Sequence, residues 1–420
     1  MTGIKHGVRM RSIAALLIIA LACLVSALSS AAPSSAPQQV TLTWSDDPRT
    51  TQTIAWQTAS FCPRGRAQYA EAAAGNGLPV NAVAVVARGE PLLTDGEKII
   101  IHTATLTGLK PGTRYIYRVG ADGGWSEPLS FKTAPDEARA FKFLVFGDTQ
   151  NDVYDLWRAV LRRACGTNPD AAFWTVVGDL VEVGQDPEQW DAWFDASQEA
   201  IDIIPVMPLT GNHEYYTPLW GERSLPSMFT ARFKLPGNGP EGMKGQVYSF
   251  DYGDVHFVML DSQAREGARF LPDMLERQKA WLEKDLAATK KQWKVAFLHK
   301  PPYNSETARG NGAVKAAFVP ILERHRVAVV FSGHEHVYAR TYPLHDDAVA
   351  AAPSEGTVYV TAGRAGGKAR VKARAGEWHE VYYNPAEEPN YLVVKVAGNV
   401  LAVEVYKLGG DLIDNWKIEK

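Results

Sequence analysis

The chain has 420 residues, which is enough for a large core and for two or three domains. Its 44 basic and 47 acidic residues give a net charge of -3, and this balance excludes the strongly basic character of a nucleic-acid-binding protein. The 12 Trp and 16 Tyr residues are typical of a compact folded protein and not of a disordered one.

Residues 1–32 have the pattern of a secretory signal peptide. Three basic residues precede an apolar run at 13–28, and small residues and a Pro/Ser-rich stretch follow it. The run is too short and too rich in alanine for a permanent membrane span, so we expect none after cleavage and a secreted or periplasmic protein. Cys23 leaves open the alternative of a lipoprotein anchor, although the residues before it match a lipidation site poorly.

Only two cysteines follow this leader, Cys62 and Cys165. Two cysteines do not make a disulfide framework. The sequence does not tell whether they pair.

Residues 38–134 alternate between apolar and polar with a period of two, in segments separated by turn residues. This pattern predicts a small antiparallel sandwich of fibronectin III or immunoglobulin type. The stretch 106–115 is typical of the corner that such sandwiches carry, with Tyr115 just inside the next strand. Only 68–74 has the length of a helix. We expect His102 to be a strand residue and not a ligand.

A change of pattern near 133–138 predicts a domain boundary, with a second domain at 140–420. From there, apolar runs alternate with segments of helical spacing, which is typical of a layered α/β domain. The predicted elements are a strand at 141–146, a helix at 152–165, a strand at 173–177, a helix at 188–201 and a strand at 204–209.

The rest of this domain continues the pattern. Residues 216–245 are rich in Pro and Gly and are expected to form a long loop over the site. The last ninety or so residues alternate again, which predicts antiparallel strands that complete the sheet. Between them we expect strands at 247–249, 255–259, 293–298 and 327–331, and helices around 278–286 and 314–325.

Side chains that bind metals follow five of the predicted strands, at the point where each strand ends. In open α/β sheets the ligand crevice lies outside these carboxyl ends. Imidazole and carboxylate groups suit divalent ions, and a pair of ions needs a shared carboxylate to relieve their repulsion. Each residue alone could be a capping Asp, a turn Asn or a buried His, but five such strand ends together argue against coincidence. The residues are Asp148, Asp179, Asn212, His213, His299, His334 and His336.

These residues belong to ordered motifs: Gly147-Asp148, Gly178-Asp179, Gly211-Asn212-His213-Glu214, His299 and Gly333-His334-Glu335-His336. The set resembles the calcineurin-like metallophosphoesterase superfamily, and the segments 298–305 and 336–340 resemble its purple acid phosphatase branch. The N-terminal sandwich is similar to the domain that precedes the catalytic one in that branch. The resemblance implies an α/β (α+β) four-layer β-sandwich catalytic domain, preceded by a small all-β fibronectin III/Ig-like sandwich.

The resemblance also implies roles for the candidate residues. Asp148, Asp179 and His336 would hold the first metal, and Asp179 would bridge to the second. Asn212, His299 and His334 would complete the second metal. His213 would lie outside the ligand set, where it could orient the phosphate or protonate the departing alkoxide.

The sequence departs from the purple acid phosphatase pattern at the place of its iron-binding tyrosine, three positions after the bridging aspartate. Glu182 stands there, so we expect no tyrosinate–iron site. The metals are then open among Fe, Mn, Zn and Mg. Glu182 or Gln150 could fill the place of the tyrosine, and Glu182 could instead be a solvated loop acid.

A second departure concerns the histidine pair that plant members carry after the segment 304–305. Ala308 and Arg309 stand there, so the acid role of that pair is absent. Arg309 could grip phosphate as a bidentate donor or be a plain surface arginine. We expect Arg340 to form a structural ion pair, and Arg364, on a flexible loop, is a weaker candidate for the substrate.

Together these observations predict a secreted, dinuclear metal-dependent phosphoesterase. It would hydrolyse small phosphate monoesters by attack of a metal-held hydroxide, in the manner of an acid phosphatase. A phosphodiesterase or nucleotidase of the same superfamily is the nearest alternative. A catalytically inert protein that binds through its sandwich is a further one. The oligomeric state and the physiological substrate are not indicated.

Overall fold

The computed structural model describes residues 36–59, 62, 64–73, 77–94, 97–121, 124–150, 154–219, 221–305, 310–370 and 373–420. The predicted signal peptide, Cys23, Ala308 and Arg309 lie outside the described residues. Residues 35–420 form one compact unit.

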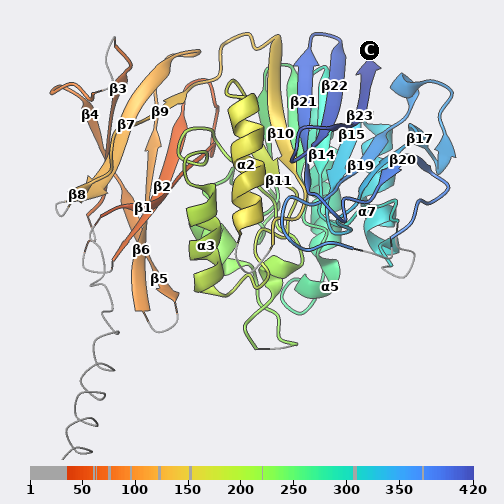
Figure 1. Cartoon of the computed structure of the whole chain (residues 1–420), viewed down its shortest axis with the longest axis horizontal. Coiled ribbons are helices and arrows are strands. Elements are labelled where there is room, and N and C mark those ends of the chain that lie inside the picture. The colour runs from red at the N-terminus through yellow and green to blue at the C-terminus, as the bar shows by residue number, and fades with distance from the viewer. Residues whose placement is uncertain are drawn as a thin grey trace, which may run out of the picture. The chain divides into compact units, whose positions relative to one another are not determined.

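The N-terminal sandwich consists of two antiparallel sheets, as predicted (Figure 1). One has the order β1-β2-β6-β5 and the other β4-β3-β7-β8, with β9 also paired to β7. Its strands are β1 (Gln38–Thr43), β2 (Gln52–Ala59), β3 (Arg66–Glu71), β4 (Val83–Val86), β5 (Arg88–Thr94), β6 (Glu97–Leu106), β7 (Arg114–Ala121), β8 (Gly124–Trp125) and β9 (Leu129–Lys132).

Three details of the sandwich test the predictions. The corner is confirmed, because the hydroxyl of Tyr115 accepts a 2.9 Å hydrogen bond from the backbone N–H of Lys110. His102 is a strand residue of β6, stacked on Trp56 with ring centroids 5.2 Å apart. The helix considered at 68–74 is wrong: this stretch belongs largely to β3, which is hydrogen-bonded on both sides, to β4 and β7. Ladder pairing outweighs local helix propensity here.

The layered part contains two larger sheets. The first has the order β11-β10-β21-β22-β23, and the second β12-β13-β14-β15-β19-β16-β20. Their strands are β10 (Ala140–Phe146), β11 (Trp174–Val176), β12 (Tyr248–Tyr252), β13 (Val255–Met259), β14 (Trp293–Phe297), β15 (Val329–Ser332), β16 (Tyr338–Thr341), β19 (Val358–Ala362), β20 (His379–Tyr383), β21 (Asn390–Ala397), β22 (Val400–Lys407) and β23 (Leu412–Glu419). The short strands β17 (Leu344–His345) and β18 (Ala348–Val349) form a separate hairpin.

Helices cover the outer faces of both sheets, which gives the four layers (Figure 1). On the first sheet, Trp157 of α2 packs edge-on against Phe146 of β10, with ring centroids 5.0 Å apart. On the second sheet, Leu282 of α6 and Phe318 of α7 share a buried cluster with the strands. The helices are α2 (Asp155–Thr167), α3 (Pro187–Ser197), α4 (Ser227–Arg232), α5 (Ala264–Gly267), α6 (Met274–Ala288) and α7 (Gly312–Arg324), with 3-10 turns η1 (His213–Tyr215) and η3 (Pro353–Glu355).

The core between the sheets is aromatic. Phe143 of β10 stacks on Phe173 with centroids 4.9 Å apart and meets Phe257 of β13 edge-on at 5.2 Å. Along this core β10 runs parallel to β11 in the first sheet, and β13, β14 and β15 run parallel to one another in the second. Their carboxyl ends therefore point toward one edge, where the candidate residues follow.

The strand predicted at 204–209 is wrong in part. The segment runs beside β11, with hydrogen bonds from Trp174 N–H to Pro205 C=O and from Met207 N–H to Trp174 C=O. However, only Val206 forms a bridge, and no named strand results. Pro205 and Pro208 lack the N–H groups that a continuous ladder needs. The loop predicted at 216–245 also contains the short helix α4.

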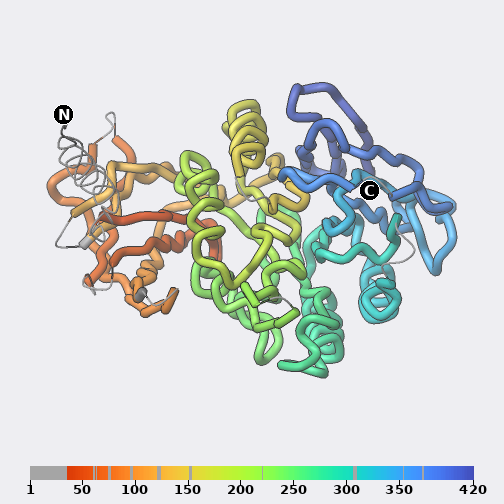
Figure 2. The backbone as a smooth tube through the Cα atoms, turned by 60° about the horizontal axis from the view of Figure 1, so that its bottom comes forward, coloured from red at the N-terminus to blue at the C-terminus, as the bar shows by residue number. Residues whose placement is uncertain are grey.

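The sandwich lies beside the layered part (Figure 2). Trp44 is buried where the two meet. Its ring stacks on Tyr252 with centroids 5.5 Å apart and meets Phe173 at 5.7 Å. The backbone of Leu42 continues the contact, because its N–H donates to Ile201 and its C=O accepts from Val206. The sandwich therefore contributes directly to the aromatic core behind the candidate site.

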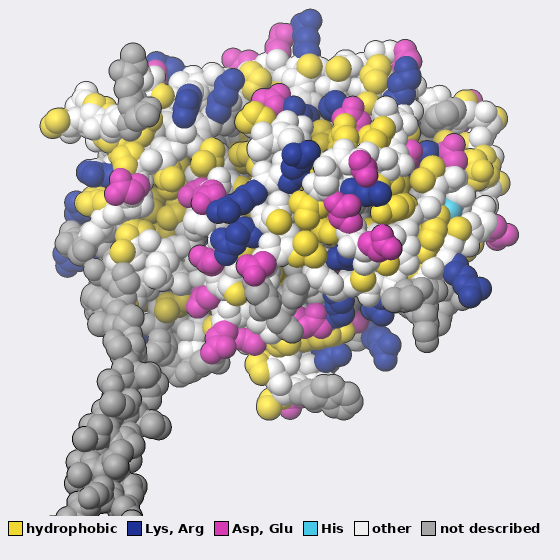
Figure 3. All heavy atoms as spheres, in the orientation of Figure 1, with side chains coloured by type: hydrophobic (Ala, Val, Ile, Leu, Met, Phe, Trp, Pro, Cys, Tyr) yellow, Lys and Arg dark blue, Asp and Glu magenta, His cyan; other side chains and the backbone are white. Residues whose placement is uncertain are grey.

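Surface features agree with the balanced composition. On the face in Figure 3, Lys and Arg side chains are interspersed with Asp and Glu.

Cys62 and Cys165 are free thiols, so these two cysteines do not pair. Among the residues that the structure describes, no helix is both long and apolar enough to cross a membrane.

Candidate metal centre

The structure brings six of the predicted residues into one cluster, and Asp179 lies at its centre. Two groups of side chains each offer ligand atoms within 4.8 Å of one another. One group is Asp179, His299 and His334, and the other is Asp148, Asp179 and His336. Asp179 is thus common to both groups, which is the arrangement that two neighbouring cations require.

Asp148 follows β10 and is buried. Its Oδ2 lies 2.9 Å from Nε2 of His336, and its Oδ1 accepts a 2.8 Å hydrogen bond from the backbone N–H of His334. The carboxylate therefore orients the loop that carries both histidines. The other nitrogen of His336, Nδ1, contacts the backbone carbonyl of Lys368, which leaves Nε2 directed into the cluster.

Asp179 is buried and has a left-handed backbone, with φ of 53°. Its Oδ2 lies 3.2 Å from Nε2 of His299, and its Oδ1 accepts a 2.9 Å hydrogen bond from the N–H of His213. Burial raises the pKa of Asp179, but the neighbouring histidines outweigh it and hold the pKa well below its usual range. Asp179 is therefore an anion in this environment.

His299 and Asn212 lie on the other side of Asp179. The Nδ1–H of His299 donates to the carbonyl of Val177 at 2.8 Å, so its Nε2 faces Asn212 Oδ1 and Nδ1 of His334, each at 3.2 Å. Burial lowers the pKa of His299, but the charge of Asp179 outweighs this and raises it to about 9. Two imidazole nitrogens and an amide oxygen that face one another are a suitable donor set for a cation.

Close packing of the loops explains the glycines that begin two of the motifs, Gly211 and Gly333. A Cβ at Gly211 would overlap Oδ1 of Asp179, and a Cβ at Gly333 would overlap Oδ1 of Asp148. Backbone strain accompanies this packing, because His334 and His336 have φ of 72° and 56°. Such a conformation costs on the order of 1–3 kcal/mol for a residue other than glycine and is concentrated at functional sites.

His213 lies beside the cluster. Its Nδ1 contacts the carbonyl of Glu182 at 2.6 Å, and its Nε2 lies 3.8 Å from Oδ2 of Asp179. Its ring lies 4.6 Å from that of Tyr216, whose hydroxyl accepts from Asn212. The imidazole is therefore held at the rim of the cluster and not among its ligand atoms.

Comparison with known proteins agrees with this geometry. Residues 37–133 match the family described as the N-terminal domain of purple acid phosphatases, and residues 141–338 match the calcineurin-like phosphoesterases. Residues 141–338 are thus a calcineurin-like phosphoesterase domain, and residues 37–133 are a domain of the kind found at the N-terminus of purple acid phosphatases. The two candidate ligand groups agree with the phosphoesterase match.

Individual relatives show how far the similarity extends. The chain is 30% identical over 297 residues to purple acid phosphatase 23 of Arabidopsis thaliana, covering 64% of this chain but only 62% of the relative. It is 27% identical over 371 residues to human acid phosphatase type 7, covering 81% and 80% of the two chains. The structure of purple acid phosphatase PPD1 from yellow lupin superposes with a TM-score of 0.74 at 19% identity, covering 92% of this chain and 74% of that one, which shows the shared fold.

Gln150 and Glu182 differ in how they relate to the cluster of this phosphoesterase domain. Nε2 of Gln150 lies 3.2 Å from Asp179 Oδ2 and 3.4 Å from His336 Nε2. Its Oε1 is buried and has no hydrogen-bond partner within the described part of the chain. An amide oxygen without a partner, next to two candidate ligands, fits a bound cation. Glu182 belongs to neither ligand group, and its carboxylate pairs with Lys368.

Three arginines were considered from the sequence as substrate ligands or ion-pair partners, and they differ in what the structure shows. Arg340 forms ion pairs with Asp414 and Glu380, as predicted. Arg364 is buried, and its guanidinium donates to the carbonyls of Gly366, Pro385 and Ala386, so it stabilises its loop and does not face the substrate. Arg309 lies outside the described residues.

Sequence reasoning missed the role of Glu214, although it quoted the motif. This side chain is fully buried, and its carboxylate accepts backbone hydrogen bonds from Asp179 at 2.9 Å, Leu180 at 2.8 Å and Gly211 at 2.6 Å. It thus ties the loop after β11 to the loop that carries Asn212. Burial and the charge of Asp179 raise the pKa of Glu214 to about 8. The acid three positions after Gly211 was the available signal.

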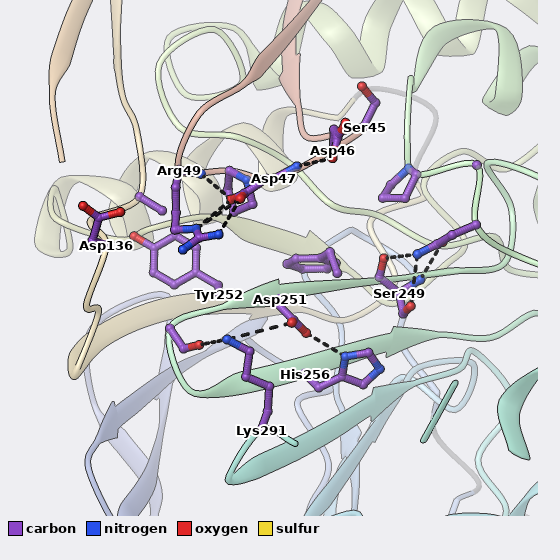
Figure 4. Close-up of a pocket in the computed structure, with 17 residues that line it drawn as sticks. Ser45, Asp46, Asp47, Arg49, Asp136, Ser249, Asp251, Tyr252, His256 and Lys291 are labelled. Atoms are coloured by element: carbon purple, nitrogen blue, oxygen red, sulfur yellow. Dashed lines mark hydrogen bonds and ion pairs between the residues drawn. The ribbon is translucent and has the colours of Figure 1, made fainter. Parts of the chain in front are cut away.

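A separate pocket lies between the sandwich and the layered part (Figure 4). Its lining includes Asp47, Arg49, Asp251 and His256, and none of the cluster residues. In Figure 4, His256 and Lys291 both approach Asp251, and Arg49 pairs with Asp47. These charged side chains are therefore paired, and the pocket is distinct from the metal centre.

Proposed function

We propose that this protein is a phosphatase that hydrolyses small phosphate monoesters with the help of two metal ions. The observation that carries the proposal is the position of Asp179 in both ligand groups. Acid phosphatase type 7, a relative that the chain covers to 80%, supports a monoester substrate through its name. When bound, two such ions lower the pKa of coordinated water and neutralise charge on phosphate oxygens.

Each ion would have its own set of protein ligands. Asp148, Asp179 and His336 would hold the first ion. Asp179, Asn212, His299 and His334 would hold the second. Gln150 is favoured over Glu182 for the place left by the missing tyrosine, because Gln150 contacts Asp179 and His336 while Glu182 is engaged with Lys368. Fe, Mn, Zn and Mg all suit such a set of imidazole and oxygen donors.

His213 would act on the substrate and not on the ions. Its Nδ1 contact with the carbonyl of Glu182 fixes the ring, so Nε2 faces the cluster from the rim. From there it would orient a phosphate oxygen or deliver a proton to the departing alkoxide. Arg309 is kept as a candidate phosphate ligand, on the basis of its residue type alone.

A phosphodiesterase or nucleotidase is the alternative within the same superfamily. Turnover of p-nitrophenyl phosphate and of bis(p-nitrophenyl) phosphate by the metal-reconstituted protein distinguishes the two. The proposal predicts a much higher kcat/KM for the monoester. A higher value for the diester would contradict it, and the absence of turnover with both esters would favour an inert binding protein.

We also propose that the protein is exported and that residues 1–32 are removed. The proposal rests on the charged, apolar and small-residue pattern of this segment. The domain boundaries proposed with it are 38–134 and 140–420. N-terminal sequencing of the protein from its native host tests the export step: a start near residue 33 is expected. An intact Met1, or a lipid-modified Cys23 at the new N-terminus, would contradict it.

A further inference from the structure

Lys368 occupies a position that links both sides of the candidate centre. Its Nζ lies 2.7 Å and 3.0 Å from the two carboxylate oxygens of Glu182 and 3.3 Å from Nε2 of His213. Its backbone carbonyl contacts Nδ1 of His336. The residue is thus fixed by its main chain to a candidate ligand and by its ammonium to the histidine at the rim.

We propose that Lys368 binds the phosphate group of the substrate and that Glu182 is its anchor. The proposal rests on the proposed phosphatase function and adds a residue that determines the substrate class. Both side chains are about one-third exposed, at 35% for Lys368 and 33% for Glu182, so the pair is open to an entering substrate. The ammonium is a compact point charge with three donors, which suits a phosphate oxygen.

Three other basic residues within the described part of the chain are engaged elsewhere. The guanidinium of Arg364 donates hydrogen bonds to three backbone carbonyls. Arg340 is paired with Asp414, and Lys300, next to His299, is paired with Glu266. Of these four cations, Lys368 is the one whose charged group touches His213. It is therefore the cation best placed to meet a phosphate that lies over the ligand cluster.

This pairing explains the role of Glu182, which belongs to neither ligand group. It stands three positions after Asp179, but its carboxylate is directed to Lys368, and its carbonyl holds Nδ1 of His213. One residue therefore positions both the ammonium and the imidazole from the same loop. A long lysine side chain loses much rotamer freedom when it binds a ligand, and an acid that already orders it lowers that loss.

The placement predicts a preference between substrate classes. A phosphate monoester carries up to two negative charges near neutral pH, whereas a diester carries one. An additional cation at the rim strengthens the binding of the more highly charged ester through direct charge-assisted hydrogen bonds. Lys368 should therefore favour the monoester over the diester.

The test compares four variants of the metal-reconstituted full chain. Lys368→Met removes the charge at similar volume, Lys368→Arg keeps the charge, and Glu182→Gln removes the anchor. Lys395→Met is the matched control, since Lys395 also pairs with a glutamate, Glu404, but on β21. The readouts are KM and kcat for both nitrophenyl esters, the inhibition constant of inorganic phosphate, and the metal content per chain.

Lys368→Met is expected to raise the KM for the monoester and the inhibition constant of phosphate by about ten- to a hundredfold, with a smaller effect on the diester. Lys368→Arg should restore part of the loss, and Glu182→Gln should weaken phosphate binding less. Metal content should stay unchanged in every variant. An unchanged KM and inhibition constant in Lys368→Met would overturn the proposal, as would loss of a metal ion from Glu182→Gln.

Failure of the proposed function has a different outcome. If the wild-type protein hydrolyses neither ester, titration calorimetry with inorganic phosphate still measures the contribution of Lys368 to binding. Weaker phosphate binding by Lys368→Met than by Lys395→Met would then support the role of Lys368. Equal binding by the two variants would overturn it.

Discussion

The backbone N–H of His334 donates a 2.8 Å hydrogen bond to Oδ1 of Asp148, although the two residues are 186 positions apart in the chain. Gly333 precedes this N–H, and a Cβ there would overlap the same oxygen. The first and the last motif of the cluster therefore meet at a point that has no room for a side chain. Gly333 and Glu214 are not candidate ligands, but each helps to hold the ligand-bearing loops in place. Each therefore leads to a prediction.

Gly333→Ala should disrupt the centre without unfolding the layered part. The added methyl group must push Asp148 or the loop of His334 aside, because backbone and carboxylate atoms surround it. We expect turnover to fall about a hundredfold or more, since misplacement of a catalytic group by about 1 Å costs this much in rate. Metal content should fall as well. Gly237→Ala is the matched control, because this glycine, like Gly333, has no positive φ, and it has open space where the Cβ would lie. Equal turnover in both variants would contradict the argument.

Glu214→Gln should loosen the two loops that it joins. The carboxylate accepts from the N–H groups of Asp179, Leu180 and Gly211, and an amide would turn a donor toward some of these donors. Leaving buried donors unsatisfied costs about 1–3 kcal/mol, so the free energy of unfolding should fall by that amount. Metal affinity should fall with it. Urea unfolding and metal titration measure the two effects, and an unaffected metal affinity would contradict the positioning role.

His256 should make stability depend on pH. Burial lowers its pKa, but hydrogen bonds to Asp251 at 2.7 Å and Asp285 at 2.8 Å outweigh this and raise it to about 9. A raised pKa means that the folded state holds the proton more tightly than the unfolded one. Its contribution is therefore complete below about pH 6.5 and is lost as the pH rises to about 9.

The comparison of wild type with His256→Gln isolates this effect. Their difference in unfolding free energy should be about 1–3 kcal/mol at pH 6 and should shrink strongly by pH 9.5. Urea unfolding at both pH values measures it. A difference that stays constant or grows with pH would contradict the assignment.

Trp44 should couple the sandwich to the layered part. It is buried among Phe173, Phe250 and Tyr252, which belong to the other side of the contact. Trp44→Ala should lower the stability by about 3–5 kcal/mol, as expected for a buried aromatic residue, or separate unfolding into two transitions. Calorimetry measures this. Turnover at low temperature should stay near wild type, because Trp44 touches no residue of the metal centre.

The sequence predicted those features that depend on local pattern and on strand ends. Short apolar strands that end in Gly-Asp, Gly-Asn-His or Gly-His-Glu-His predicted the convergence of Asp148, Asp179 and the histidines, because parallel strands present their carboxyl ends at one edge. The alternation of 38–134 predicted the antiparallel sandwich, because successive side chains of a strand point to opposite faces of its sheet. These features can be recognised from the periodicity of apolar residues and from the glycines and turn residues that end each strand.

Features that depend on distant partners were not predictable. The strand predicted at 204–209 was wrong in part, because its two prolines interrupt a ladder whose apolar pattern was otherwise correct. The helix considered at 68–74 was wrong because pairing with β4 and β7 decided the conformation. Lys368 carries no local motif, and its contact with Glu182 spans 186 positions. The buried role of Arg364 has no signal in spacing alone, whereas the spacing of Glu214, three positions after Gly211, was a signal that sequence reasoning did not use.

The most direct test of the account is elemental analysis of the purified, metal-reconstituted protein and its Asp179→Asn variant, measured together with turnover of p-nitrophenyl phosphate. Because Asp179 belongs to both ligand groups, the account predicts two ions per chain in the wild type. In the variant it predicts the loss of at least one ion and of most turnover. A wild type that binds less than one ion, or a variant that keeps both ions and full activity, would contradict it.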